Sequence, residues 1–166
     1  LEMRAQMGRL LNSYVRIKGL VSIDVYSRWG AHFHVGESLE SSVPAPAELA
    51  LWQQQAQAAT SSAVWRGVVD NPNTSSTQHR VLQVVRVIRH YSAESGQSEV
   101  VGLVAIHLNN QVIQSFVQSA GLDPNSQLML VDKQGNIALH SDERRFGTVL
   151  DPALFTLVQG TQSALP

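Results

Sequence analysis

The sequence predicts an α+β fold in which an antiparallel sheet is flanked by helices. Its strand-like segments follow one another in runs, first two and then three, whereas a parallel α/β sheet would alternate strands with helices. Helix-like segments precede each of these runs. A length of 166 residues favours one ordinary domain with enough chain to bury a hydrophobic core.

The composition describes a folded domain with a weakly charged surface. Hydrophobic residues make up 43% of the chain and charged residues only 15%, so uncharged polar residues must form much of the surface. The net charge of −1 argues against a nucleic-acid partner, because such proteins carry a basic excess. The absence of cysteine excludes disulfides, thiolate metal sites and a cysteine nucleophile. No apolar run approaches the ~20 residues of a membrane span, and no signal peptide is recognisable.

Residues 1–18 predict a helix, and Gly19 is its expected stop. The helix carries one apolar stripe, which would lean on the sheet or on a partner helix. The stripe comprises Met3, Met7, Leu10, Tyr14 and Ile17.

Two strands are predicted next, over 20–28 and 31–35, with a turn at Trp29 and Gly30 between them. The first strand alternates apolar with polar residues, which is the period of a half-buried strand. Its apolar side comprises Val21, Ile23 and Val25, and its polar side comprises Ser22, Asp24 and Tyr26.

A Ser/Pro-rich loop over 38–46 leads to a predicted helix over 47–59, which Pro46 is suited to start and which carries Trp52. Three strands follow, separated by polar turn segments. Their predicted ranges are 63–69, 80–91 and 100–108.

The rest of the chain repeats this plan in smaller form, with a helix over 111–120, a hairpin of strands 127–131 and 136–140, and a helix over 152–159. The hairpin turn ends at Gly135, which can take a positive φ. Local hydrogen bonds of Asp132 and His140 are expected to fix this hairpin. Two strands do not form a stable sheet alone. This part of the chain therefore either packs on the first domain or has further strands outside the sequence.

The motifs of common enzyme classes are missing: there is no phosphate loop, no nucleophile elbow and no His-Glu-x-x-His. His32 and His34 point to one face of a strand, as two metal ligands would, but no third ligand is fixed by the sequence. We therefore expect no metal site, no cofactor and no catalytic residue in this chain.

Several stretches together resemble the extracytoplasmic Cache sensor domains, whose double form has two PAS-like modules behind one long N-terminal helix. In the first module they are the strand pair 19–35, the helix with Trp52 followed by Trp65, the strand 81–88 closed by Arg89, and the strand 102–108. In the second module the resemblance rests on Leu130-Val131-Asp132-Lys133-Gln134-Gly135-Asn136-Ile137, followed by His140 and Gly147.

The resemblance implies the extracytoplasmic sensor domain of a bacterial inner-membrane receptor, facing the periplasm or the exterior. A small molecule would bind the membrane-distal module, residues 19–110, behind the signalling helix 1–18. Residues 111–166 would begin a second, incomplete PAS-like module, and the membrane spans would lie outside the sequence. The output would be a histidine kinase, a diguanylate cyclase or a chemoreceptor, so the full-length protein can be an enzyme although this domain is not.

The family's best-defined subfamily binds amino acids, and this sequence departs from its motif. Aligned on Trp52, Ala50 stands at the carboxylate-clamping Arg and Gln53 at the second aromatic, while His107 stands at the amine-binding Asp. Without those charges, an ordinary amino acid is not the expected ligand.

The predicted ligand contacts are Trp52, Trp65, Tyr26, Arg86 and His107. Each has a structural alternative. The two tryptophans are equally well explained as core residues, and Tyr26 as an exposed strand residue. Arg86 lies in an apolar strand and needs an anion if it is buried, which could be Asp24, Glu99 or a ligand carboxylate.

A different function remains open at this level, namely a protein-interaction module without a small ligand. In that case the apolar stripe of the N-terminal helix would pair two subunits into a homodimer. An unrecognised hydrolase is a third alternative.

Overall fold

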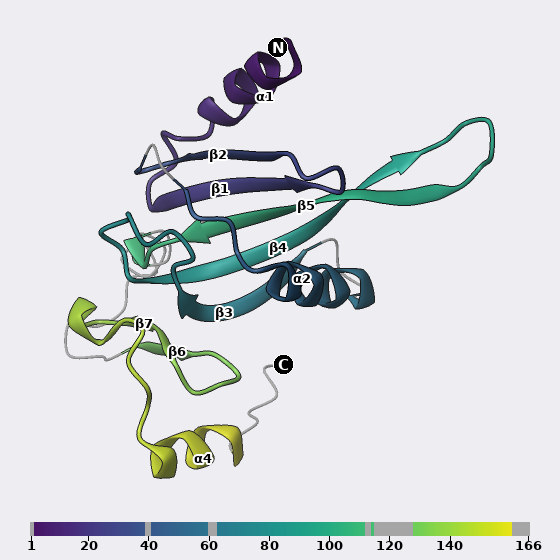
Figure 1. The fold of residues 1–166 in the computed structure, drawn as a ribbon. Helices are drawn as coiled ribbons and strands as arrows, with labels where there is room; N and C mark the ends of the chain where they lie inside the picture. Colours follow the sequence, from purple (N-terminus) through teal and green to yellow (C-terminus); the bar gives the residue numbers. More distant parts are fainter. Residues whose placement is uncertain (1, 39–40, 60–62, 112–113, 115–127, 161–166) are drawn as a thin grey trace.

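A five-stranded antiparallel sheet with the order β2-β1-β5-β4-β3 forms the larger part of the structure (Figure 1). The computed structural model describes residues 2–38, 41–59, 63–111, 114 and 128–160. The strands are β1 Leu20–Ser27, β2 His32–Gly36, β3 Val64–Asp70, β4 Arg80–Tyr91 and β5 Ser98–Leu108. The predicted α+β architecture is therefore confirmed, and these strands match the predicted ones closely.

Both faces of the sheet are covered at β1, which differs from the half-buried strand that the alternation predicts. Positions 21–26 are all buried. One face packs Ile23 and Val25 with Leu11 and Val35. The opposite face carries the polar residues of β1, and they are buried under loops and under the helix α2 (Pro46–Ala58). The polar alternation therefore marks a buried polar layer.

The helix α2 lies across the face of the sheet formed by β1, β5 and β4 (Figure 1). Pro46 occupies the start of the helix, as predicted. Only Trp52 and Ala56 of this helix are buried, and they pack on Tyr26, Val85 and residues of β5.

The N-terminal helix α1 covers Glu2–Asn12, so it ends before the predicted residue 18. A series of turns replaces its expected last part. Leu11 is buried and Met7 packs beside it, whereas the side chains of Leu10, Tyr14 and Ile17 are 46–57% exposed. The buried stripe therefore differs from the predicted one. No helix in the described ranges is long and apolar enough to cross a membrane.

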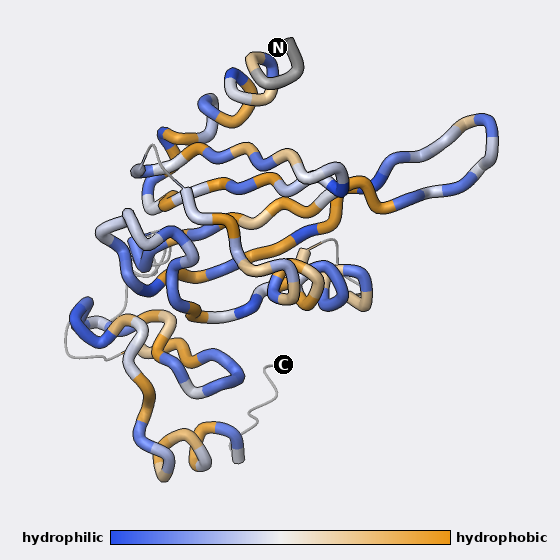
Figure 2. The backbone as a smooth tube through the Cα atoms, in the orientation of Figure 1, coloured by the Kyte–Doolittle hydropathy of each residue, from blue (hydrophilic) through white to orange (hydrophobic). Residues whose placement is uncertain are grey.

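The strands β4 and β5 extend as a hairpin beyond the rest of the sheet (Figure 1). Figure 2 shows that hydropathy alternates along the strands within the sheet and that the end of this hairpin is mainly hydrophilic.

A separate two-stranded sheet follows, made of β6 (Met129–Val131) and β7 (Ile137–His140). A 3-10 helix, η1 (Glu143–Arg145), and a helix, α4 (Pro152–Gly160), complete this part. Gly135 has φ +86°, as its place in the predicted turn requires. The predicted helix over 111–120 lies outside the described residues, except for residues 111 and 114.

The second sheet contacts the first through Asp132. Its carboxylate accepts a hydrogen bond of 2.9 Å from the Val68 amide in β3. This contact needs Gly67, which has φ +82° and lies so close that an added Cβ would be 2.6 Å from the carboxylate. The two sheets therefore meet at the irregular part of β3.

Candidate functional site

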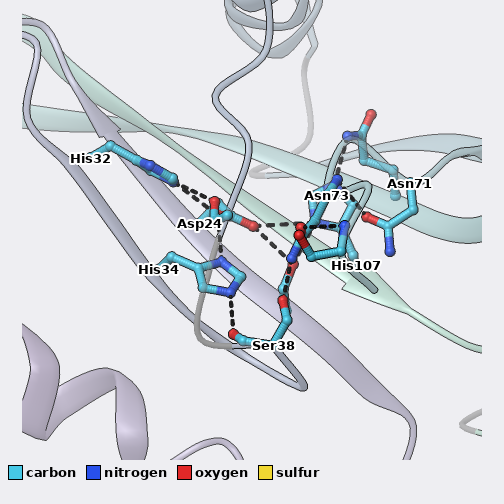
Figure 3. A network of polar contacts seen from close by, with 11 residues as sticks. Asp24, His32, His34, Ser38, Asn71, Asn73 and His107 are labelled. Carbon is cyan, nitrogen blue, oxygen red and sulfur yellow. Dashed lines mark hydrogen bonds and ion pairs between the residues drawn. The ribbon is translucent and has the colours of Figure 1, made fainter. Parts of the chain in front are cut away.

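The buried carboxylate of Asp24 is the centre of a polar network on the α2-facing side of the sheet (Figure 3). Its Oδ1 atom lies 2.9 Å from His32 Nε2 and 2.8 Å from His34 Nδ1. Its Oδ2 atom accepts a hydrogen bond of 2.8 Å from Ser22 and lies 3.5 Å from His107 Nδ1. Burial raises the pKa of Asp24, but the hydrogen bonds from the three histidines outweigh it and hold the pKa well below its usual range.

His34 is placed to carry a positive charge. Its Nδ1 faces the Asp24 carboxylate, and its Nε2 lies 3.0 Å from the carbonyl oxygen of Ser38. Both partners only accept hydrogen bonds, so both are satisfied only by the imidazolium form. Burial lowers the pKa of His34, but these contacts with Asp24 and Ser38 raise it above its usual value overall.

A continuous chain of hydrogen bonds crosses four strands from Arg66 to Asp24. Arg66 donates to the Gln83 amide oxygen, and the Gln83 amide nitrogen donates to His107 Nε2 over 2.9 Å. His107 Nδ1 then lies 2.9 Å from Ser22 Oγ, which donates to Asp24. Because His107 accepts at Nε2, it donates at Nδ1, and this fixes the neutral Nδ1–H tautomer.

Loop residues close the network on the side of His34. Asn73 donates to the Ser38 hydroxyl, and its backbone amide is held by the Asn71 side chain at 3.0 Å (Figure 3). Ser41 adds a hydrogen bond of 3.2 Å to Asp24. The loops after β2 and β3 are therefore tied to the polar layer of the sheet.

Aromatic rings lie beside this network. Tyr26 stacks on His32 with 4.7 Å between ring centroids and 6° between planes. Trp52 lies edge-on to Tyr26 at 6.4 Å and to His107 at 6.5 Å, and the Arg66 guanidinium lies 5.1 Å from its ring.

Two of these aromatic residues have buried polar atoms without a hydrogen-bond partner among the described residues: the Tyr26 hydroxyl and the Trp52 indole nitrogen. Such groups cost about 1–3 kcal/mol when nothing pairs with them. Burial, with the negative charges of Asp24 and Glu48, raises the pKa of Tyr26 above its usual value. The phenol therefore stays protonated and can donate to a ligand.

Tyr26 lines a pocket of about 410 Å³ between the sheet and the first turns of α2. The wall is formed by the loop before α2, by the end of β1 and by β5. Its residues are Ser27, Arg28, Val43, Pro44, Pro46, Leu49, Ala50, Gln53, Gly102 and Leu103. Ala50 and Gln53, where the family motif has Arg and an aromatic, are thus pocket residues here.

The structure brings together three of the five predicted ligand contacts, namely Tyr26, Trp52 and His107. Trp65 is 62% exposed and lines a separate cleft near the second sheet. Arg86 is exposed on the opposite face, where it pairs with Val104 across the strands. The anions considered for it are engaged elsewhere, because Asp24 contacts histidines and Glu99 pairs with Arg28 at 2.6 Å.

Sequence reasoning missed that Asp24, His32 and His34 form one cluster. The signal was present in the period of the two strands. Asp24 and Tyr26 share a face, and the hairpin register places His34 and His32 directly opposite them. The described residues include no His, Cys, Asp and Glu group arranged to hold a metal ion.

No protein-family model matches the chain, and no curated protein matches it by sequence. Solved structures do match its fold. The ligand-binding domain of the Campylobacter jejuni chemoreceptor Tlp3, in complex with L-norvaline, has a TM-score of 0.62 and 14% identity over 95% of this chain. The ligand-binding domain of the Pseudomonas aeruginosa PAO1 amino-acid chemoreceptor PctC, in complex with GABA, has a TM-score of 0.55 and 17% identity over 98% of this chain. The chain spans 59% and 65% of those two chains.

These two structures correct the expectation about the ligand class. Both hold an amino acid, so the expectation that an ordinary amino acid is not the ligand is wrong. It rested on Ala50 and His107, which stand where the motif has charged residues, and on Gln53, which stands where the motif has an aromatic residue. In the structure a different charged residue, Arg28, lies in the pocket wall.

The order of the strands, the helix over the sheet and the second sheet at its edge agree with the predicted PAS-like architecture. The chain therefore has the Cache-type fold found in the ligand-binding domains of bacterial chemoreceptors.

Proposed function

We propose that this chain is a sensor domain that binds a small amino acid in the pocket at Tyr26 and passes the signal to a membrane receptor. The observation that carries the proposal is Tyr26, which lines the pocket and whose hydroxyl is buried and unpartnered among the described residues. A ligand acceptor in the pocket would satisfy this donor. The volume of about 410 Å³ lies within the usual range of small-molecule sites.

One charged and one amide side chain in the pocket wall support a zwitterionic ligand. Arg28 Nη1 donates a hydrogen bond of 2.6 Å to the Glu99 carboxylate, and the guanidinium lies 4.8 Å from the centroid of the Trp29 ring. These two contacts hold the guanidinium in place. Its remaining donors suit a ligand carboxylate, since guanidinium and carboxylate pair in a fork. The Gln53 amide oxygen can accept from a ligand ammonium group.

The first test is calorimetry and thermal unfolding of the chain with a panel of amino acids that includes L-norvaline and GABA. A ligand at about 100 times its Kd should stabilise the protein by about 2.7 kcal/mol. The proposal fails if no amino acid of the panel binds.

The decisive variant is Tyr26→Phe, which removes only the hydroxyl. Its affinity for the best amino acid should fall about fivefold, because one hydrogen bond contributes about 1 kcal/mol. The stability of the ligand-free protein should not fall, since no described residue forms a hydrogen bond with the hydroxyl there. Tyr91→Phe is the matched control, because Tyr91 is 66% exposed and does not line the pocket. Equal affinity in both variants would remove Tyr26 from the site.

For the complete receptor, we propose an extracytoplasmic domain of a membrane-anchored protein with a cytoplasmic output. Residues 19–110 form the ligand-binding module, residues 1–18 lead toward the membrane, and residues 111–166 belong to a second module. The likeness of the fold to chemoreceptor domains supports this arrangement. Fusing the chain to a reporter kinase or chemoreceptor output, and measuring a response that Tyr26→Phe shifts to higher ligand concentration, tests it.

A further inference from the structure

A second cavity lies between β3 and the β6–β7 hairpin, with a volume of about 420 Å³. It shares no lining residue with the Tyr26 pocket. Its walls come from both sheets and from one residue of α2. The lining residues are Gln55, Val64, Trp65, Arg66, Gly67, Val131, Asp132, Lys133 and Gln134.

Arg66 places a guanidinium cation in the wall of this cleft. Its Nε donates to the Gln55 side-chain oxygen at 2.9 Å and its Nη1 donates to the Gln83 oxygen, and both acceptors are uncharged amides. No ion pair joins Arg66 to a carboxylate within the described part of the chain. Burial lowers the pKa of Arg66, and only the charge of Glu48 opposes this. A partly buried cation of this kind favours an anionic partner.

The carboxylate that lines the cleft is already occupied. Asp132 accepts hydrogen bonds from the backbone amides of Val68, Gln134 and Asn136, at 2.8–2.9 Å, and from the Asn136 side chain. These bonds outweigh burial and hold the pKa of Asp132 below its usual value. The cleft residues Arg66, Lys133 and Asp132 together leave a net positive charge.

Trp65 is another lining residue of the same cleft. Its exposed fraction of 62% is large for a tryptophan, and no ring contact pairs it with another described aromatic residue. A flat apolar group stacked on this ring would cover it. The lining of the cleft thus combines an exposed tryptophan with two cationic residues.

We propose that this cleft is a second ligand site and that it takes a small aromatic carboxylate. The ligand carboxylate pairs with Arg66 and Lys133, and its ring packs on Trp65. This site is independent of amino-acid binding at Tyr26. Because its walls come from both sheets, the bound ligand bridges the two modules.

Benzoate is the probe, and the measurement is calorimetry of the complete chain with tryptophan fluorescence as a second readout. Benzoate should bind and quench the fluorescence. Benzamide, which has the same shape without the charge, should bind at least tenfold more weakly, because it cannot pair with the two cations. Failure of benzoate to bind, or equal binding of benzamide, would overturn the proposal.

Variants locate the site. Trp65→Ala should weaken benzoate binding about three- to tenfold and abolish the quenching. Lys133→Gln should weaken binding about two- to fivefold, in line with an exposed ion pair, without change in the melting temperature. Lys18→Gln is the matched control, because Lys18 is exposed and lies outside the cleft. Unchanged binding in both Trp65→Ala and Lys133→Gln would refute the site.

A competition experiment separates the two pockets. Tyr26→Phe should bind benzoate as the unmodified chain does, and L-norvaline should not displace benzoate. Displacement of benzoate by L-norvaline would place benzoate in the Tyr26 pocket and reject the second site. Loss of amino-acid binding with retained benzoate binding would reject only the proposed function.

Discussion

At the scale of single residues, the buried charge of Asp24 is tolerated because the sheet surrounds it with donors. Three histidines and two serines contact this one carboxylate. They come from β1, β2 and β5 and from the loop after β2. Removing one partner of a buried charged pair costs about 3–5 kcal/mol, whereas an exposed pair contributes little. The cluster is therefore expected to contribute strongly to the stability of this face.

The stability should depend on pH through His34. Its pKa is raised in the folded state, so its contribution is complete below the unfolded value of about 6.5 and is lost as pH rises through the folded value. Asp24 has a lowered pKa, so its contribution is complete above about 4 and is lost only as pH falls through its folded value. Urea unfolding from pH 5 to 9 should show the free energy of unfolding falling on the alkaline side.

His34→Gln should reduce that alkaline decrease, and His90→Gln should leave it unchanged. His90 is the matched control because it is exposed on the projecting hairpin. A decrease of the same size in His34→Gln would assign the pH dependence to another group.

The sequence predicted which residues of this cluster share a strand face but not that they form a cluster. It placed His32 and His34 on one face, and Asp24 and Tyr26 on one face. It did not reveal that loops cover the polar face of β1, because burial by a loop leaves no periodic signal. For Arg86 the error was in the opposite direction. Its apolar neighbours in the sequence suggested that it is buried, yet its side chain is exposed.

At the scale of the elements, α2 is held to the sheet by few side chains. Trp52 is 1% exposed and contacts Tyr26, His107 and Arg66. Ala56 is the other buried residue of this helix. The helix therefore depends on one large anchor.

Trp52→Ala should lower the free energy of unfolding by about 3–5 kcal/mol, because it removes the largest fully buried side chain of the molecule's described part. Leu51→Ala is the matched control on the same helix, since Leu51 is 46% exposed and its loss should cost less than about 1 kcal/mol. Chemical denaturation followed by circular dichroism measures both. Similar losses would show that α2 is not anchored through Trp52.

The sequence predicted the strands better than the first helix. Alternation and turn residues located β1 to β5 because each strand is bounded by polar or glycine-containing turns. The predicted helix over 1–18 was too long because the helical spacing of apolar residues continues past Asn12. In the structure the helix ends at Asn12, and a series of turns leads to Gly19 and β1. Within the helix that forms, Met7 and Leu11 pack on the sheet.

At the scale of the whole molecule, the two sheets are joined by a small polar contact. Asp132 holds the Val68 amide, and Arg80 reaches the Asn136 side chain at 3.3 Å. The sequence predicted Asp132 only as a turn residue. Its second role depends on Gly67, whose positive φ and missing side chain let the carboxylate approach.

Asp132→Ala should lower the free energy of unfolding by about 1–3 kcal/mol, because it leaves the buried Val68 amide without its partner. Protease cleavage in the β6–β7 hairpin should also become faster. Asp142→Ala is the control, since the partners of Asp142 lie within its own turn. Equal cleavage rates in the two variants would mean that Asp132 does not hold the sheets together.

The hydrogen-bond chain from Arg66 to Asp24 also determines how the strands align. Arginine can only donate and a carboxylate can only accept, so Gln83, His107 and Ser22 each have one possible orientation. A slip of two residues along any of these strands would keep every side chain on its face but leave a buried amide or imidazole unpaired. The polar layer thus selects one strand register that the apolar pattern alone would leave open.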